Sequence, residues 1–277
     1  MSVPDTTTAE RLPLTGAYLP ISPFGPLSAL ALTLVIGVIA LIAFVVFFVA
    51  AILARHGTLL QASILANPDG SPTLEGIALS LVGMIGAQAV MVGFAILFAG
   101  FKGVPRHRSL ALLPARGGPL AYVIGTLGLF AGVAAIGFAL DTIAPHDQLA
   151  DLKLFIPVVH SQWLWLAVLV VVIGAPLSEE FLFRGFLFPA LAKTRIGILG
   201  AGLVSTSVWT LLHLGYSWQG LVAVFSIGLI FTLILWRTGS LWVTIIAHGI
   251  YNGAVLAFVR FGLAPPVESA APALALF

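Results

Sequence analysis

Seven runs of mainly apolar residues constrain the fold of this chain more than any other feature. They cover roughly residues 27–53, 74–101, 119–140, 163–191, 198–214, 219–236 and 241–261. A bilayer core of about 30 Å is crossed by about 20 helical residues. A backbone in lipid must satisfy its own hydrogen bonds, which runs of this length can do only as helices. The sequence therefore predicts an all-α, polytopic transmembrane helical bundle with about seven spans, within a range of roughly six to eight.

The composition agrees with a membrane protein and excludes other classes. Of the 277 residues, 60% are hydrophobic and 8% are charged, whereas a soluble domain carries about 25% charged residues. The net charge of +2 and the scattered basic residues do not indicate nucleic-acid binding, so we expect the lipid bilayer, and no nucleic acid, as a partner. Because the chain has no cysteine, it has no disulfide, thiolate metal ligand or Cys nucleophile.

The spans form two groups between polar ends. We interpret residues 1–26 as an N-terminal polar tail, 27–140 as N-terminal transmembrane helices, 159–262 as a second helical core and 263–277 as a C-terminal tail. The first apolar run is longer than the about 7–15 residues of a signal-peptide core. We therefore expect this run to stay in the membrane.

The charges of the loops predict the orientation. Segment 102–116 contains four basic residues, whereas the loop after the third span contains Asp141, Asp147 and Asp151 against Lys153. Because basic loops stay in the cytoplasm, we expect the N-terminus inside and the C-terminus outside. The Ala- and Gly-rich composition suits a bacterium with a GC-rich genome, so the expected location is a bacterial inner (plasma) membrane.

Ionisable residues inside membrane spans are candidates for function, because each costs about 2.5–3.5 kcal/mol to insert. Helical spacing places Glu180 and Arg184 on one face at i, i+4 and turns Glu179 away by about 100°. Arg184 can then neutralise Glu180 and leave Glu179 to face a polar cavity, where a carboxylate can act as a general base. The alternative is a helix end at the interface, with Ser178 as N-cap.

Two further segments place polar groups at membrane depth. His213 follows Trp209 by four residues near the end of the fifth span, where a histidine is often only structural. His248 and Asn252 share one face of the seventh span. They could donate hydrogen bonds to a developing oxyanion, or they could only join helices, at about 0.6 kcal/mol per bond.

In order, the three segments read Glu-Glu-x-x-x-Arg at 179–184, Trp-x-x-x-His at 209–213 and His-x-x-x-Asn at 248–252. They resemble the motifs of the CAAX protease and bacteriocin-processing (CPBP) family of intramembrane endopeptidases, which includes the type II CAAX prenyl endopeptidases. The second motif of that family commonly has Phe where this chain has Trp209. The resemblance covers about residues 160–260 and marks the second helical core as the catalytic one.

The resemblance implies an intramembrane endopeptidase that hydrolyses membrane-associated or prenylated peptides, by CAAX-type or by bacteriocin and leader processing. On this hypothesis Glu179 is the general base on a water that His213 helps to position. His248 and Asn252 would stabilise the tetrahedral oxyanion. The supporting residues would be Glu180, Arg184 and Trp209.

The hypothesis has a geometric condition. Counted from the predicted cytoplasmic ends of the spans, His213 lies further towards the outer face than His248. The motifs can therefore meet only if helices tilt or break, and Pro176 and Pro189 are candidate kinks.

The sequence leaves the metal question and two other functions open. Glu179, His213 and His248 could ligate zinc as a His₂Glu site does, but they lie on three helices and no His-Glu-x-x-His motif is present. We expect no obligatory cofactor, with zinc as the alternative. A proton-coupled transporter also buries Glu, Arg and His, although it would more often show paired repeats. A non-catalytic scaffold or immunity protein of the same fold is the other alternative, and the intact motifs argue against it.

Overall fold

The computed structural model describes residues 18–58, 65–145, 150–153 and 155–262. Helices are the only regular elements within these ranges. Six of them are long and apolar enough to cross a membrane, and a seventh, Gly197–His213, is shorter. The predicted helical membrane bundle is therefore confirmed. Most of the predicted N-terminal tail, the whole C-terminal tail and Asp147 lie outside the described residues.

The helices follow the predicted spans closely. The N-terminal group consists of α1 (Pro26–His56), α2 (Leu74–Ala99), η2 (Phe101–Gly103), α3 (Arg106–Ser109) and α4 (Pro119–Ile143). The next group consists of η3 (Ala150–Leu152), α5 (Ile156–Val159), α6 (Leu164–Ala167), η4 (Val168–Gly174), α7 (Ala175–Glu179), η5 (Glu180–Leu187) and α8 (Phe188–Ala192). The last group consists of α9 (Gly197–Thr210), η6 (Leu211–His213), α10 (Trp218–Thr238), α11 (Leu241–Ala257) and η7 (Phe258–Gly262).

Local signals account for the helix ends. α1 begins at Pro26, which needs no backbone donor in the first turn, and it ends before Gly57, whose φ of 70° is left-handed. The hydroxyl of Thr73 accepts from the Gly76 amide and caps α2, and Ser217 caps α10 in the same way.

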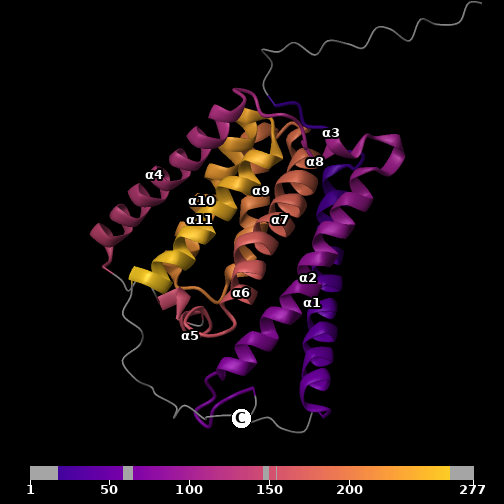
Figure 1. The fold of residues 1–277 in the computed structure, drawn as a ribbon. Helices are drawn as coiled ribbons and strands as arrows, with labels where there is room; N and C mark the ends of the chain where they lie inside the picture. Colours follow the sequence, from indigo (N-terminus) through magenta and orange to yellow (C-terminus); the bar gives the residue numbers. More distant parts are fainter. Residues whose placement is uncertain (1–17, 59–64, 146–149, 154, 263–277) are drawn as a thin grey trace, which may run out of the picture.

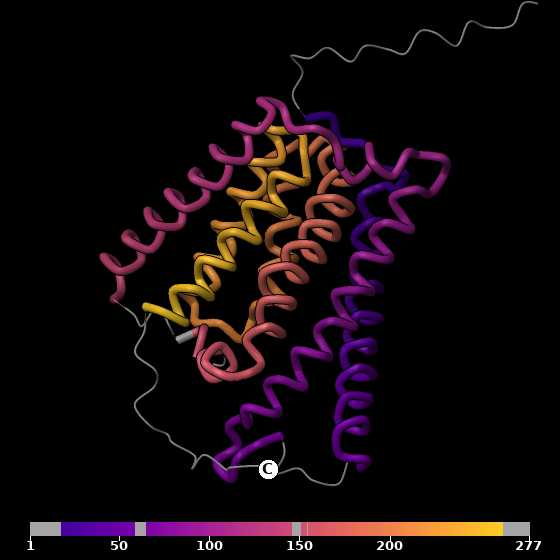
Figure 2. The backbone as a smooth tube through the Cα atoms, in the orientation of Figure 1, coloured from indigo at the N-terminus to yellow at the C-terminus, as the bar shows by residue number. Residues whose placement is uncertain are grey.

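The bundle has the fourth-span helix at its centre. α1 and α2 form an antiparallel pair on one side of it, and α4 lies on the other side against α10 and α11 (Figure 1). α9 packs against the η5 and α8 parts of the central helix, α10 packs against α9, α4 and α11, and the tube view shows the same arrangement (Figure 2). The central helix thus contacts elements from both halves of the chain, which places its polar side chains at the middle of the bundle.

The central helix passes both of its prolines without breaking. It continues from Leu164 to Ala192, and a π-helical stretch precedes each proline, η4 before Pro176 and η5 before Pro189. A proline lacks an amide donor and crowds the preceding turn, and the wider π turn accommodates this defect. Each of the two candidate kink sites, Pro176 and Pro189, therefore follows a π-helical stretch.

Residues 18–25 pack on the bundle, although the sequence predicts them as part of a polar tail. The ring of Tyr18 stacks on Phe188, with ring centroids 5.7 Å apart, and Phe24 contacts Phe186 at the same distance. Burial raises the pKa of the Tyr18 phenol. The chain before α1 is therefore anchored to α8 and η5.

Candidate active site

A buried ion pair lies at the centre of the bundle. The side chains of Glu180 and Arg184 are 0% and 1% exposed, and Nη1 of Arg184 donates to Oε1 of Glu180 at 3.2 Å. Nη2 of Arg184 also donates to the carbonyl of Gly228. The guanidinium lies 4.3 Å from the ring centre of Trp209, in a cation–π contact. The predicted pairing of Glu180 with Arg184 is present in the structure.

Glu180 has a second partner, which its helical spacing does not reveal. Nδ1 of His248 lies 3.1 Å from Oε1 of Glu180. A carboxylate oxygen can only accept a hydrogen bond, so Nδ1 carries the proton and the ring is held in one orientation. The other ring nitrogen, Nε2, faces Oε2 of Glu179 at 3.9 Å. Glu180 therefore orients His248 in addition to balancing the charge of Arg184.

Glu179 faces away from the ion pair, as the 100° rotation predicts. Its side chain is 16% exposed, and Oε2 accepts a hydrogen bond from the indole Nε1 of Trp209 at 2.7 Å. No sequence argument predicts this bond. Because the Phe common at this position in the family has no donor, the substitution by Trp209 changes the chemistry around Glu179.

Trp209 also connects the two histidines. Its ring meets His213 edge-to-face, with centroids 5.1 Å apart, and meets His248 at 6.1 Å. Nδ1 of His213 lies 3.3 Å from the carbonyl of Trp209, which can only accept. The proton of His213 is therefore on Nδ1, where it is donated to the Trp209 carbonyl, and Nε2 is an acceptor.

Asn252 is held against the central helix. Its amide Nδ2 donates to the carbonyl of Val171 at 2.8 Å, within the π-helical η4. The adjacent carbonyl of Val170 accepts from Gln88 of α2 at 3.0 Å. α11 can approach this closely because Gly249 faces the carbonyl of Val172, where a Cβ would be 3.0 Å away. One N–H of Asn252 is thus used structurally, and the amide has a second.

The candidate side chains meet at one cavity of about 490 Å³. Its lining includes all four predicted catalytic residues, Glu179, His213, His248 and Asn252, together with Trp209. The convergence that the catalytic hypothesis requires is therefore present, with Trp209 lying between the histidines. The wall opposite the polar groups is apolar and includes Ala134 and Gly137 of α4 and Ala223 of α10.

The sequence analysis did not identify several polar residues of the cavity as site residues. Tyr216 and Tyr251 line it, and so does Asp151, which accepts from the amide and hydroxyl of Ser217 at 2.7 and 2.8 Å. Burial, and then the charges of Glu179 and Asp151, raise the pKa of Tyr216 to about 12. Tyr216 is therefore a neutral hydrogen-bonding group at neutral pH.

The donor set does not form a three-ligand metal site in the described part of the chain. Glu179 and Nε2 of His248 face each other, but the indole N–H of Trp209 occupies Oε2 of Glu179. His213 is turned towards the carbonyl and ring of Trp209. The arrangement does not fit the Glu179, His213 and His248 zinc set, and the chemistry below is therefore developed with water alone.

Comparison with known protein families gives a match to the part of the chain that carries these side chains. Residues 161–254 match the family model of the Rce1-like type II CAAX prenyl endopeptidases, and this range contains all three motifs. No curated protein and no solved structure matches the chain significantly. The chain is an integral membrane protein whose residues 161–254 are thus similar to the Rce1-like type II CAAX prenyl endopeptidases, a family of membrane proteases.

Proposed function

We propose that the chain is an intramembrane endopeptidase in which the carboxylate of Glu179 activates a water to hydrolyse a peptide bond. One observation carries this proposal. Of two adjacent glutamates, Glu180 is buried and neutralised by Arg184, whereas the partly exposed Glu179 faces the cavity beside Nε2 of His248. Such a division separates a supporting carboxylate from a reactive one. The family match supports a peptide substrate that is lipidated or otherwise held in the membrane.

The proposed reaction uses the groups that line the cavity. Glu179 takes a proton from water as the water oxygen forms a bond to the carbonyl carbon, and Nε2 of His213 accepts the second hydrogen bond of that water. Negative charge develops on the carbonyl oxygen. The carbon–nitrogen bond then breaks, and Glu179 returns its proton to the departing amine.

Two donors are assigned to the oxyanion. They are Nε2–H of His248 and the second N–H of Asn252. Because Nδ1 of His248 already donates to Glu180, donation from Nε2 requires the doubly protonated ring. This requirement gives Glu180 a positioning role, since its carboxylate holds the proton on Nδ1.

The test is cleavage by purified protein in detergent. The substrates are a fluorogenic farnesylated CAAX peptide and a small set of leader peptides, and the variants are Glu179→Gln and the control Glu75→Gln. Glu75 lies in the first turn of α2, pairs with Arg55 and is not among the residues that line the cavity. We expect Glu179→Gln to lower kcat by about 10²–10⁴-fold, the range of general base catalysis, with an unchanged melting temperature.

Full activity of Glu179→Gln would overturn the proposal. A chelator arm tests metal dependence in the same assay. Activity that survives chelation supports the water mechanism. Loss of activity that zinc restores would assign a metal to Glu179 and the histidines instead.

A further inference from the structure

The two ends of the bundle differ strongly in charge. Seven exposed basic residues lie at one end, between α2 and α4, between α8 and α9, and in the last turn of α10. They are Lys102, Arg106, Arg108, Arg116, Lys193, Arg195 and Arg237. Nζ of Lys193 donates to the carbonyl of Ser22, so the chain before α1 lies at this end too. We call this the basic end; none of the described acidic residues lies there.

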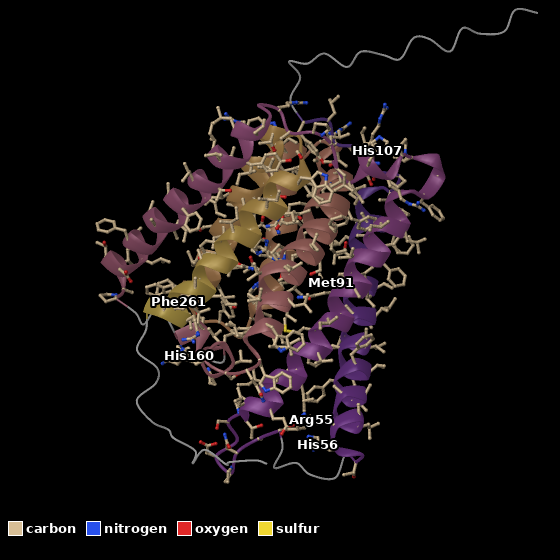
Figure 3. All side chains as sticks on the ribbon, in the orientation of Figure 1. Arg55, His56, Met91, His107, His160 and Phe261 are labelled. Atoms are coloured by element: carbon tan, nitrogen blue, oxygen red, sulfur yellow. The ribbon has the colours of Figure 1, made fainter. Side chains whose placement is uncertain are left out.

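The other end is weakly acidic. It carries Asp69, Glu75, Asp141 and Asp151 against Arg55, Lys153 and Arg260, which is four negative and three positive charges. Figure 3 shows the two ends apart, with His107 at the basic end and Arg55, His56 and His160 towards the opposite one. Because basic loops stay in the cytoplasm, this asymmetry places the basic end inside the cell.

The cavity belongs entirely to the half of the bundle away from the basic end. The residues of α4 that line the cavity begin at Val133, and those of α11 begin at His248. The residues of α10 that line it end at Ile227. It also includes Asp151 and Tyr216, which lie in the connections at that end. The mouth is thus formed by partly exposed residues of the weakly acidic end.

The half between the catalytic groups and the basic end is filled by side chains. Every residue of η5 and α8, from Glu180 to Ala192, is buried. Phe183, Phe186 and Phe188 are among the largest side chains that are fully buried. A peptide that approached from the basic end would have to displace this packed core.

We infer that the cavity opens on the non-cytoplasmic side of the membrane. If the proposed peptidase function holds, an opening on that side defines the substrates as lipid-anchored or membrane-spanning peptides whose scissile bond lies on the non-cytoplasmic side. Prenylated proteins with a C-terminus in the cytoplasm would then be excluded. The orientation of the cavity itself depends only on the charge asymmetry and the lining.

The chain is well suited to a direct test because it contains no cysteine. Gln219→Cys places a thiol in the cavity lining, and Arg195→Cys places one in the exposed loop at the basic end. Each variant is expressed in bacterial cells and treated with a membrane-impermeant maleimide, before or after permeabilisation. We expect Gln219→Cys to be labelled equally in both conditions and Arg195→Cys only after permeabilisation; the reverse pattern overturns the inference.

A second pair of variants protects the test against local misfolding. Leu214→Cys lies at a position that is 65% exposed, next to His213, and Arg237→Cys lies at the basic end. The same two labelling patterns are expected, and the same reversal counts against the inference.

A cleavage arm separates this inference from the proposed function. One membrane-anchored reporter is made in two versions, with its cleavable segment either exported or cytoplasmic. We expect the wild type, but not Glu179→Gln, to cut the exported version only. Cleavage of only the cytoplasmic version overturns the inference. Cleavage of neither version, with the expected labelling, overturns the peptidase function and leaves the orientation supported.

Discussion

Replacing Trp209 by Phe isolates one hydrogen bond at the candidate active site. The variant loses the donor to Oε2 of Glu179, which is 2.7 Å long. It keeps an aromatic ring over Arg184 and beside His213, where the present ring contacts are 4.3 and 5.1 Å. Phe is also the residue that the related family commonly has here, so we expect the variant to fold.

The size of the effect follows from the charge of the acceptor. A hydrogen bond to a charged group contributes about 1.5–3 kcal/mol, and each 1.36 kcal/mol corresponds to about tenfold in rate. If the bond holds Glu179 in its reactive orientation, its loss lowers kcat by roughly 10- to 150-fold. KM changes little, because the indole N–H is bound to the protein and not to substrate.

The assay is the cleavage of the fluorogenic peptide, with kcat and KM measured separately. The matched control is Trp165→Phe, the same change at a position on α6 that is 60% exposed. A kcat of Trp209→Phe within twofold of the wild type would show that Trp209 only fills space, and it would refute the positioning role.

Two further substitutions test the core around the site. Glu180→Gln leaves Arg184 buried without its counter-charge, so we expect a loss of about 3–5 kcal/mol in the free energy of unfolding, measured by thermal denaturation in detergent. The double variant Glu180→Gln, Arg184→Met should regain part of that stability. If the losses of the two single variants simply add in the double variant, the pairing is contradicted. Gly228→Ala places a Cβ 2.5 Å from Thr206 and 2.8 Å from Arg184, so we expect about 1–3 kcal/mol of destabilisation. Gly128→Ala, which meets nothing within 4 Å, is the control, and equal melting temperatures for the two variants would contradict the packing argument.

The helical spans could be predicted because they depend on one property, the length of an apolar run. Pro119 and Leu241 were expected to begin spans and do begin α4 and α11. The π-helical stretches η4 and η5 could not be predicted, since an apolar run reads the same in an α- or a π-helix. Gln88 was missed although it is an amide side chain in the middle of an apolar run, and the cost of inserting polar groups, which drew attention to Glu179, would have identified it.

Roles within the site were predictable only as far as they depend on residues of one helix. The 100° rotation between neighbouring residues separates Glu179 from Glu180, and the structure shows that separation. The i, i+4 spacing of His248 and Asn252 predicts two donors on one face, but it gives no information about partners on other helices. Those partners, Glu180 and the carbonyl of Val171, lie 68 and 81 residues away along the chain.

These distant partners change what the histidine can do. A His248 that is free of partners could present either nitrogen to an oxyanion, whereas one bound to Glu180 through Nδ1 can donate only from Nε2. The proposed mechanism therefore depends on a buried carboxylate that touches no substrate. In that mechanism the cavity-lining carboxylate of Glu179 is not sufficient by itself. Glu180 must also hold His248 in place, and Arg184 must balance the charge of Glu180. Under the proposed mechanism, that requirement accounts for two adjacent glutamates at positions where each charge is costly to insert.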